Sequence, residues 1–223
     1  MIKIKNILLC ALISVSAIGF VAQVDAKQTK RDGKWEATFQ LINNQSEFVD
    51  GGNGSSLDID SDVGWGFSLG YNVNEHFLLN YEFASTTPGY IATIAEDGNA
   101  GNTEVIDHSM DLFQSQFNAI YNFSTEQLTP YVQAGIGWTY VDSNIADGPP
   151  DGVCYWDPWW GYICDSYQDT FSDNTFTYNV AAGFRYELDN HLLFKLSYQQ
   201  VWLDMGKADT SLGMIRLEIG SIF

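Results

Sequence analysis

The chain has 223 residues and a formal net charge of -18 at pH 7, since 28 acidic residues outnumber 10 basic ones. Such a charge repels polyanions, so we expect no nucleic-acid partner. Twelve tyrosines, fourteen phenylalanines and seven tryptophans make the chain rich in aromatic rings, which require an apolar environment.

The N-terminal 26 residues predict an export signal. Lys3 and Lys5 precede the apolar run Ile7–Val21, and Val24–Ala26 offers small residues for cleavage. The run has about fifteen residues, whereas a membrane-spanning helix needs roughly twenty. We therefore expect a signal peptide at 1–26, a short segment at 27–33 and one domain at 34–223.

Alternation with a period of two residues dominates the rest of the chain. In Val63–Tyr71, large apolar residues take every odd position and only Gly or Ser takes the even ones. This pattern is typical of a β-strand with two unlike faces. In chain order the predicted strands are 35–41, 63–71, 77–83, 113–123, 132–140, 176–188, 192–202 and 215–223.

The connections between these strands alternate in length. Those at 74–76, 124–130 and 189–191 are short, whereas 43–62, 86–104 and 142–174 are long and rich in Gly, Asp, Asn and Ser. Outer-membrane barrels have short periplasmic turns and long extracellular loops. The sequence therefore predicts an all-β fold, an eight-stranded antiparallel up-and-down transmembrane β-barrel with both termini in the periplasm.

Side-chain volume favours a membrane barrel over a soluble one. An eight-stranded barrel has an interior just wide enough for ordinary side chains, so the aromatic faces must point outward. The interior then receives small and amide residues together with charges of both signs. The expected lumen charge network is Glu36, Glu82, Arg185, Glu187, Lys195, Arg216 and Glu218. A salt-bridge plug is the favoured interpretation, and a constriction that gates a narrow pore is the alternative.

Two cysteines bracket the most distinctive segment of the mature chain. Cys154 and Cys164 are expected to form a disulfide, because exported proteins meet an oxidising compartment. Between them lies a loop aromatic cluster, either a binding surface or a small core that packs on itself or dips into lipopolysaccharide. Its members are Tyr155, Trp156, Trp159, Trp160 and Tyr162.

Residues for catalysis or metal binding are not grouped in a familiar pattern. Asp58, Asp60 and Asp62 are spaced like the start of an EF-hand loop, but Val63 and Leu69 stand where that motif needs Gly and Glu. His108 and the adjacent Ser109 fall on opposite faces of a strand, so they cannot act as base and nucleophile. We expect no cofactor, no metal site and no enzymatic activity.

Two segments carry a family resemblance that covers nearly the whole mature chain. Thr129–Gly137 resembles the opening of the fifth strand in the small eight-stranded outer-membrane barrels, which include the transmembrane domain of outer-membrane protein A and its X- and W-type relatives. The ending Leu217–Phe223 is similar to the signal that the barrel-assembly machinery reads, with Phe223 as its final aromatic. The peptidoglycan-binding domain found after some of these barrels is not expected here.

The resemblance and the residue patterns together imply an outer-membrane protein of a Gram-negative bacterium. We expect a non-enzymatic barrel that supports the envelope and presents extracellular loops for interaction or adhesion. The alternative is a narrow channel for small solutes or ions, and an enzyme acting on lipid A or peptides ranks below both. The expected partners are outer-membrane lipid and lipopolysaccharide, the barrel-assembly machinery and an extracellular ligand.

Overall fold

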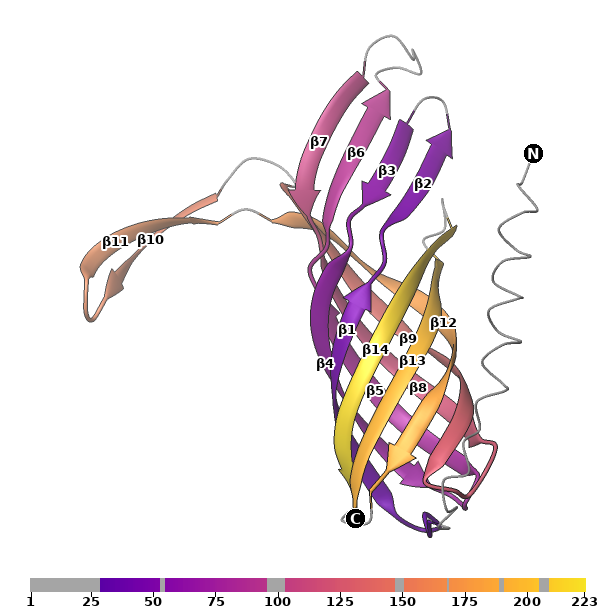
Figure 1. Ribbon diagram of the computed structural model, residues 1–223. Coiled ribbons are helices and arrows are strands. Elements are labelled where there is room, and N and C mark those ends of the chain that lie inside the picture. The colour runs from indigo at the N-terminus through magenta and orange to yellow at the C-terminus, as the bar shows by residue number, and fades with distance from the viewer. Residues whose placement is uncertain are drawn as a thin grey trace.

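A computed structural model describes residues 29–52, 55–95, 103–146, 151–167, 169–188, 191–204 and 209–223 (Figure 1). The predicted signal peptide lies outside these residues. Within them, no helix is both long and apolar enough to cross a membrane.

Eight antiparallel strands close into a barrel, which confirms the predicted fold. Around the barrel they follow the order β1-β14-β13-β12-β9-β8-β5-β4, and the first and last strands pair from Glu36 with Ile222 to Asn44 with Met214. The barrel strands are β1 (Trp35–Asn44), β4 (Asp62–Asn72), β5 (Phe77–Thr86), β8 (Asp111–Asn122), β9 (Leu128–Ala146), β12 (Thr170–Glu187), β13 (Leu192–Asp204) and β14 (Asp209–Ile222).

Most aromatic rings of the barrel strands point outward, as their volume requires, and the buried Tyr131 of β9 is an exception. Along β4, Trp65 is 50% exposed and Phe67 46% exposed, whereas Ser68 between Phe67 and the next outward residue is 2% exposed. The exposed rings of neighbouring strands contact one another, for example Phe67 with Phe83 at 5.3 Å between centroids. The outer surface of the barrel is therefore an apolar belt that suits hydrocarbon.

Close approach of strands explains the glycines on the inner face of β9. A Cβ atom added to Gly135 would lie 2.7 Å from the carbonyl oxygen of Phe117 and would also collide with the Asn118 side chain. The side chains of Asn118 and Asn179, from the adjacent strands β8 and β12, occupy this space, so only glycine fits.

The long connections, for which the sequence pattern predicted no strands, contain six of them within their described residues (Figure 1). A four-stranded sheet with the order β2-β3-β6-β7 rises beyond the barrel, and β10 and β11 form a separate hairpin. Their bounds are β2 (Glu47–Gly52), β3 (Ser55–Ile59), β6 (Gly89–Ala95), β7 (Thr103–Ser109), β10 (Asp151–Asp157) and β11 (Gly161–Tyr167).

The amino-acid composition of these segments did not predict strands. The segments are rich in Gly, Asp and Ser, yet Leu57 pairs with Ala92 and Ile59 with Tyr90, so one face of the sheet carries apolar side chains. All four pack onto the apolar cluster at the barrel mouth. Burial of this face stabilises strands that the composition disfavours.

Candidate functional site

The periplasmic half of the lumen contains a charge network of four acids and four bases. The seven residues that the sequence predicted for the network all lie in the barrel interior, and an eighth, Arg31, joins them from the N-terminal segment. Each is at most 5% exposed. The members are Arg31, Glu36, Glu82, Arg185, Glu187, Lys195, Arg216 and Glu218.

Arg185 is the centre of the network. Its Nη2 lies 2.8 Å from Oε2 of Glu36, and its Nε lies 2.5 Å from Oε1 of Glu187. Lys195 forms an ion pair with Glu36, and its Nζ is 3.9 Å from Oε2 of Glu218. Each buried charge thus has an opposite charge beside it, which the low dielectric of the interior requires.

A further ion pair joins strands β5 and β14 nearer the middle of the lumen. Arg216 forms it with Glu82, and the two side chains are each 2% exposed. The Nη2 atom of Arg216 also lies 3.8 Å from the sulfur of Met214. This arginine therefore stands at the boundary between the charge network and the apolar part of the lumen.

Amide side chains fill the next layer toward the extracellular end. Asn179 donates to Oε1 of Gln116 at 2.9 Å and to Oδ1 of Asn118 at 2.8 Å, and Gln199 donates to the same Gln116 oxygen at 2.9 Å. These bonds join strands β8, β12 and β13 across the interior and stabilise the amide layer within it.

An apolar cluster lies in the extracellular half of the lumen, where the sequence pattern predicted small, amide and charged residues. On β13 the inward positions turn apolar toward this end, from Lys195 to Val201 and Leu203, whereas β12 keeps the polar Thr175 and Thr177 there. The cluster is completed by Ile42, Ala84, Met110, Leu112, Val141, Leu212 and Met214, with Ile59 and Tyr90 from the sheet above. The sequence could have predicted this cluster, because the alternation with a period of two places its strand residues on the same inward face as the charged residues.

An apolar pocket of about 250 Å³ opens within this cluster. Its wall comes from the barrel and from the sheet above it, with Leu57 and Ile59 of β3 facing Leu203 and Leu212. The hydroxyl of Tyr90, also in the wall, donates to the carbonyl of Ser143 at 3.0 Å, which fixes the ring in place. The extracellular mouth therefore has a preformed space of apolar character.

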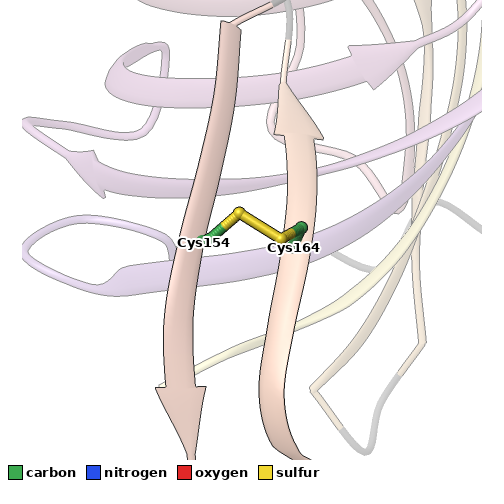
Figure 2. The surroundings of a disulfide bond; sticks show 2 residues. All are labelled: Cys154 and Cys164. Carbon is green, nitrogen blue, oxygen red and sulfur yellow. A yellow bond between two sulfur atoms is a disulfide. The ribbon is translucent and has the colours of Figure 1, made fainter.

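The β10–β11 hairpin holds the predicted disulfide, which is confirmed (Figure 2). Cys154 and Cys164 are directly opposed, and Trp156 and Tyr162 form a cross-strand pair two residues further on. Successive residues of a strand alternate between faces, so both pairs share one face. The disulfide thus joins β10 to β11 next to the aromatic cluster at the turn of the hairpin.

The turn of the hairpin presents the aromatic cluster to solvent. Oδ1 of Asp157 accepts from the backbone N–H groups of Trp159 at 2.8 Å and Trp160 at 2.9 Å, and Gly161 takes a φ of 79°. The five rings are exposed: Tyr155 45%, Trp156 74%, Trp159 88%, Trp160 80% and Tyr162 69%. They do not form a core of their own.

The described residues offer little for catalysis. No group of three or more His, Cys, Asp and Glu side chains in this part of the chain is placed to hold a metal ion. His108 accepts a bond from the backbone N–H of Ser109 at 3.1 Å, while His76 contacts the carbonyl of Asn122 at 2.8 Å in the periplasmic turns. These histidines serve local backbone structure.

Comparisons with known proteins agree with this architecture. A family model described as outer membrane protein beta-barrel domain matches residues 8–223. The outer membrane protein OprG of Pseudomonas aeruginosa is similar with a TM-score of 0.55 and 13% identity, over 86% of this chain and 97% of that one. Ail of Yersinia pestis, solved with the heparin analogue sucrose octasulfate, is similar with a TM-score of 0.50 and 15% identity, over 86% of this chain and 99% of that one. No curated protein sequence matches.

Proposed function

Because this chain belongs to the outer-membrane protein β-barrel family and is located in the outer membrane of a Gram-negative bacterium, we propose that it is a non-enzymatic barrel that supports the envelope and presents an adhesive hairpin. The observation that carries the proposal is the exposure of the rings on the β10–β11 hairpin, from 45% to 88%. Solvent-exposed aromatic clusters of this kind commonly mark binding surfaces.

Rigidity supports this role for the hairpin. The disulfide and the turn bonds of Asp157 hold the backbone before any partner arrives. A preordered binding element loses less conformational entropy on binding. Three of the exposed rings belong to tryptophans, which offer a large contact area with few rotatable bonds.

The net charge of the chain limits the chemical classes of partner that the hairpin can bind. With a net charge of -18, the surface repels sulfated or phosphorylated polymers, so the heparin analogue bound to Ail is not transferred to this protein. Neutral sugars and protein surfaces suit flat, uncharged rings better. The ligand class proposed is therefore a neutral glycan or an extracellular matrix protein.

The test is an adhesion assay with cells that display the protein. Replacing Trp159 and Trp160 with alanine should abolish attachment to surfaces coated with neutral glycans or matrix protein. The matched control is Phe48→Ala, because Phe48 is a 63% exposed ring on the other extracellular sheet. Unchanged attachment of the double variant, with normal surface display, would remove the adhesive role.

The apolar pocket favours a second candidate function, binding of a small apolar solute at the extracellular mouth. A wall of Leu, Ile, Met and Val side chains suits hydrocarbon and does not suit ions. Planar-bilayer recording separates the alternatives: steady ion channels that vanish on neutralising Arg185 or Arg216 would favour an ion channel, and a silent barrel would favour the plug. Saturable binding of a fluorescent fatty acid, lost in Leu212→Gln, would support the apolar solute.

The absence of enzymatic activity is part of the proposal. Ser109 and His108 are adjacent on one strand, and the His108 ring nitrogen accepts a backbone N–H in place of a hydroxyl. A nucleophile needs a base within hydrogen-bond reach of its side chain. Hydrolysis of lipid A or of peptides by the purified, refolded protein would overturn this part.

A further inference from the structure

Residues 29–34, called the strap here, cross the periplasmic end of the barrel before β1 begins. The N–H of Thr29 donates to the carbonyl of Thr125 at 2.9 Å, and the N–H of Gly33 donates to the carbonyl of Asn72 at 2.9 Å. The strap is thus bonded to the β8–β9 turn at one end and to the end of β4 at the other. Gly33, with a φ of 71°, turns the chain into β1.

Arg31 points from the strap into the lumen and is fully buried. Its Nη1 donates to the carbonyls of Ser124 at 3.0 Å and Glu75 at 3.4 Å, and its Nη2 donates to the carbonyl of Glu126 at 2.8 Å. Nη2 also donates to Oγ1 of Thr129 at 3.1 Å, and Nε forms an ion pair with Glu187. A guanidinium has five N–H donors in a fixed plane, and here five acceptors meet them.

These acceptors come from separate periplasmic elements. Glu75 belongs to the β4–β5 turn, Ser124 and Glu126 to the β8–β9 turn, and Glu187 to the end of β12. One side chain therefore holds the short turns together across the opening. Lysine would keep the charge but could not bond all five acceptors, because its ammonium has only three donors in a different geometry.

We propose that the periplasmic mouth is a guanidinium-binding site, which the chain's own Arg31 occupies as a removable plug that closes the lumen toward the periplasm. Arg31 also supplies the fourth positive charge against the four buried glutamates. The strap contributes no strand to the barrel, so it can leave without breaking the sheet.

The experiment measures entry of a small thiol reagent through the periplasmic mouth. Ile120→Cys provides the reporter, since Ile120 is 2% exposed and lies two residues before Asn122, which bonds the β4–β5 turn. The disulfide occupies the two native cysteines of the predicted mature chain. The reagent is a small cationic methanethiosulfonate, applied to purified protein in micelles.

Removal of the guanidinium should open the mouth. Arg31→Ala is expected to raise the rate of labelling by about tenfold or more, the factor that corresponds to about 1.4 kcal/mol of lost closure. Arg31→Lys should raise it nearly as much, because the charge alone does not fill the site. The matched control Lys30→Ala removes the neighbouring, exposed charge and should leave the rate unchanged.

Chemical rescue tests the site itself. Guanidinium chloride, well below denaturing concentrations, should return the labelling rate of Arg31→Ala toward that of the parent, whereas urea at the same concentration should not. Three outcomes would each overturn the proposal. The first is a labelling rate in Arg31→Ala equal to that of the parent, and the second is the same result in Arg31→Lys. The third is an equal effect of guanidinium and urea on the labelling rate of Arg31→Ala.

A second variant keeps the test independent of folding defects in the strap. Thr129→Val removes one acceptor, the Oγ1 at 3.1 Å, together with the bond that this hydroxyl donates to the carbonyl of Glu126 at 2.6 Å, without changing any charge. It should raise labelling by less than Arg31→Ala. The heat-dependent gel mobility of each variant should match that of the folded parent barrel, and no effect of Thr129→Val would contradict the assigned set of acceptors.

Discussion

The Arg216–Glu82 ion pair predicts a large penalty for removing one partner and a small one for removing both. Both side chains are 2% exposed, so Glu82→Gln leaves a buried arginine without its counter-charge. Loss of one member of a buried pair costs about 3 to 5 kcal/mol. The sulfur of Met214, which lies 3.8 Å from Nη2 of Arg216, is too weak an acceptor to replace the carboxylate.

The assay is urea unfolding in lipid vesicles, followed by tryptophan fluorescence. Glu82→Gln should lower the free energy of unfolding by about 3 to 5 kcal/mol, and the double variant with Arg216→Met should recover most of this loss, since uncharged replacements of a buried pair are often close to neutral. Asp58→Asn, an exposed acid on the extracellular sheet, is the control and should stay within about 0.5 kcal/mol of the parent. A loss below about 1 kcal/mol in Glu82→Gln would refute the picture of a dry, paired interior.

Further predictions concern packing, the hairpin and assembly. Gly137→Ala should destabilise the barrel by about 1 to 3 kcal/mol in the same urea assay, because a Cβ would press on the backbone of β8, whereas Gly152→Ala, with open space around it, should be neutral. Replacing Cys154 and Cys164 with serine should make the hairpin sensitive to proteases by loosening it by about 2 to 3 kcal/mol, while barrel unfolding stays unchanged. Deleting Phe223, which is 66% exposed at the end of the last strand, should reduce the amount of protein assembled in the outer membrane without lowering its synthesis, and equal assembly would refute its role as the signal.

The barrel itself could be predicted because lipid imposes a strict pattern. Every residue of a spanning strand faces either hydrocarbon or a cramped interior, so the alternation in Val63–Tyr71 has one consistent solution. The disulfide could be predicted as well, since only two cysteines follow the predicted signal peptide. Both inferences depend on local sequence and a known environment.

The extracellular strands and Arg31 could not be predicted in the same way. The sheet that contains Leu57 and Tyr90 is stabilised by contact with the barrel mouth, which depends on the closed structure. Arg31 lies outside any alternating segment, and its acceptors are mostly backbone carbonyls of distant turns. The charges of the lumen offer one hint of Arg31. Four glutamates of the strands face the lumen against three bases of the strands, so one more positive charge is needed to balance them.

The order of layers in the lumen connects these observations. An ion entering from the periplasm would meet paired charges, then amides, and finally an apolar cluster in which only a few polar side chains, such as Asn44, Thr86 and Thr177, could replace part of its hydration shell. A neutral apolar molecule faces the opposite situation, because the extracellular pocket accepts it and the charge network stops it. The layering therefore favours binding at the outer mouth over conduction through the barrel, and it leaves the exposed hairpin as the part best suited to reach a second surface.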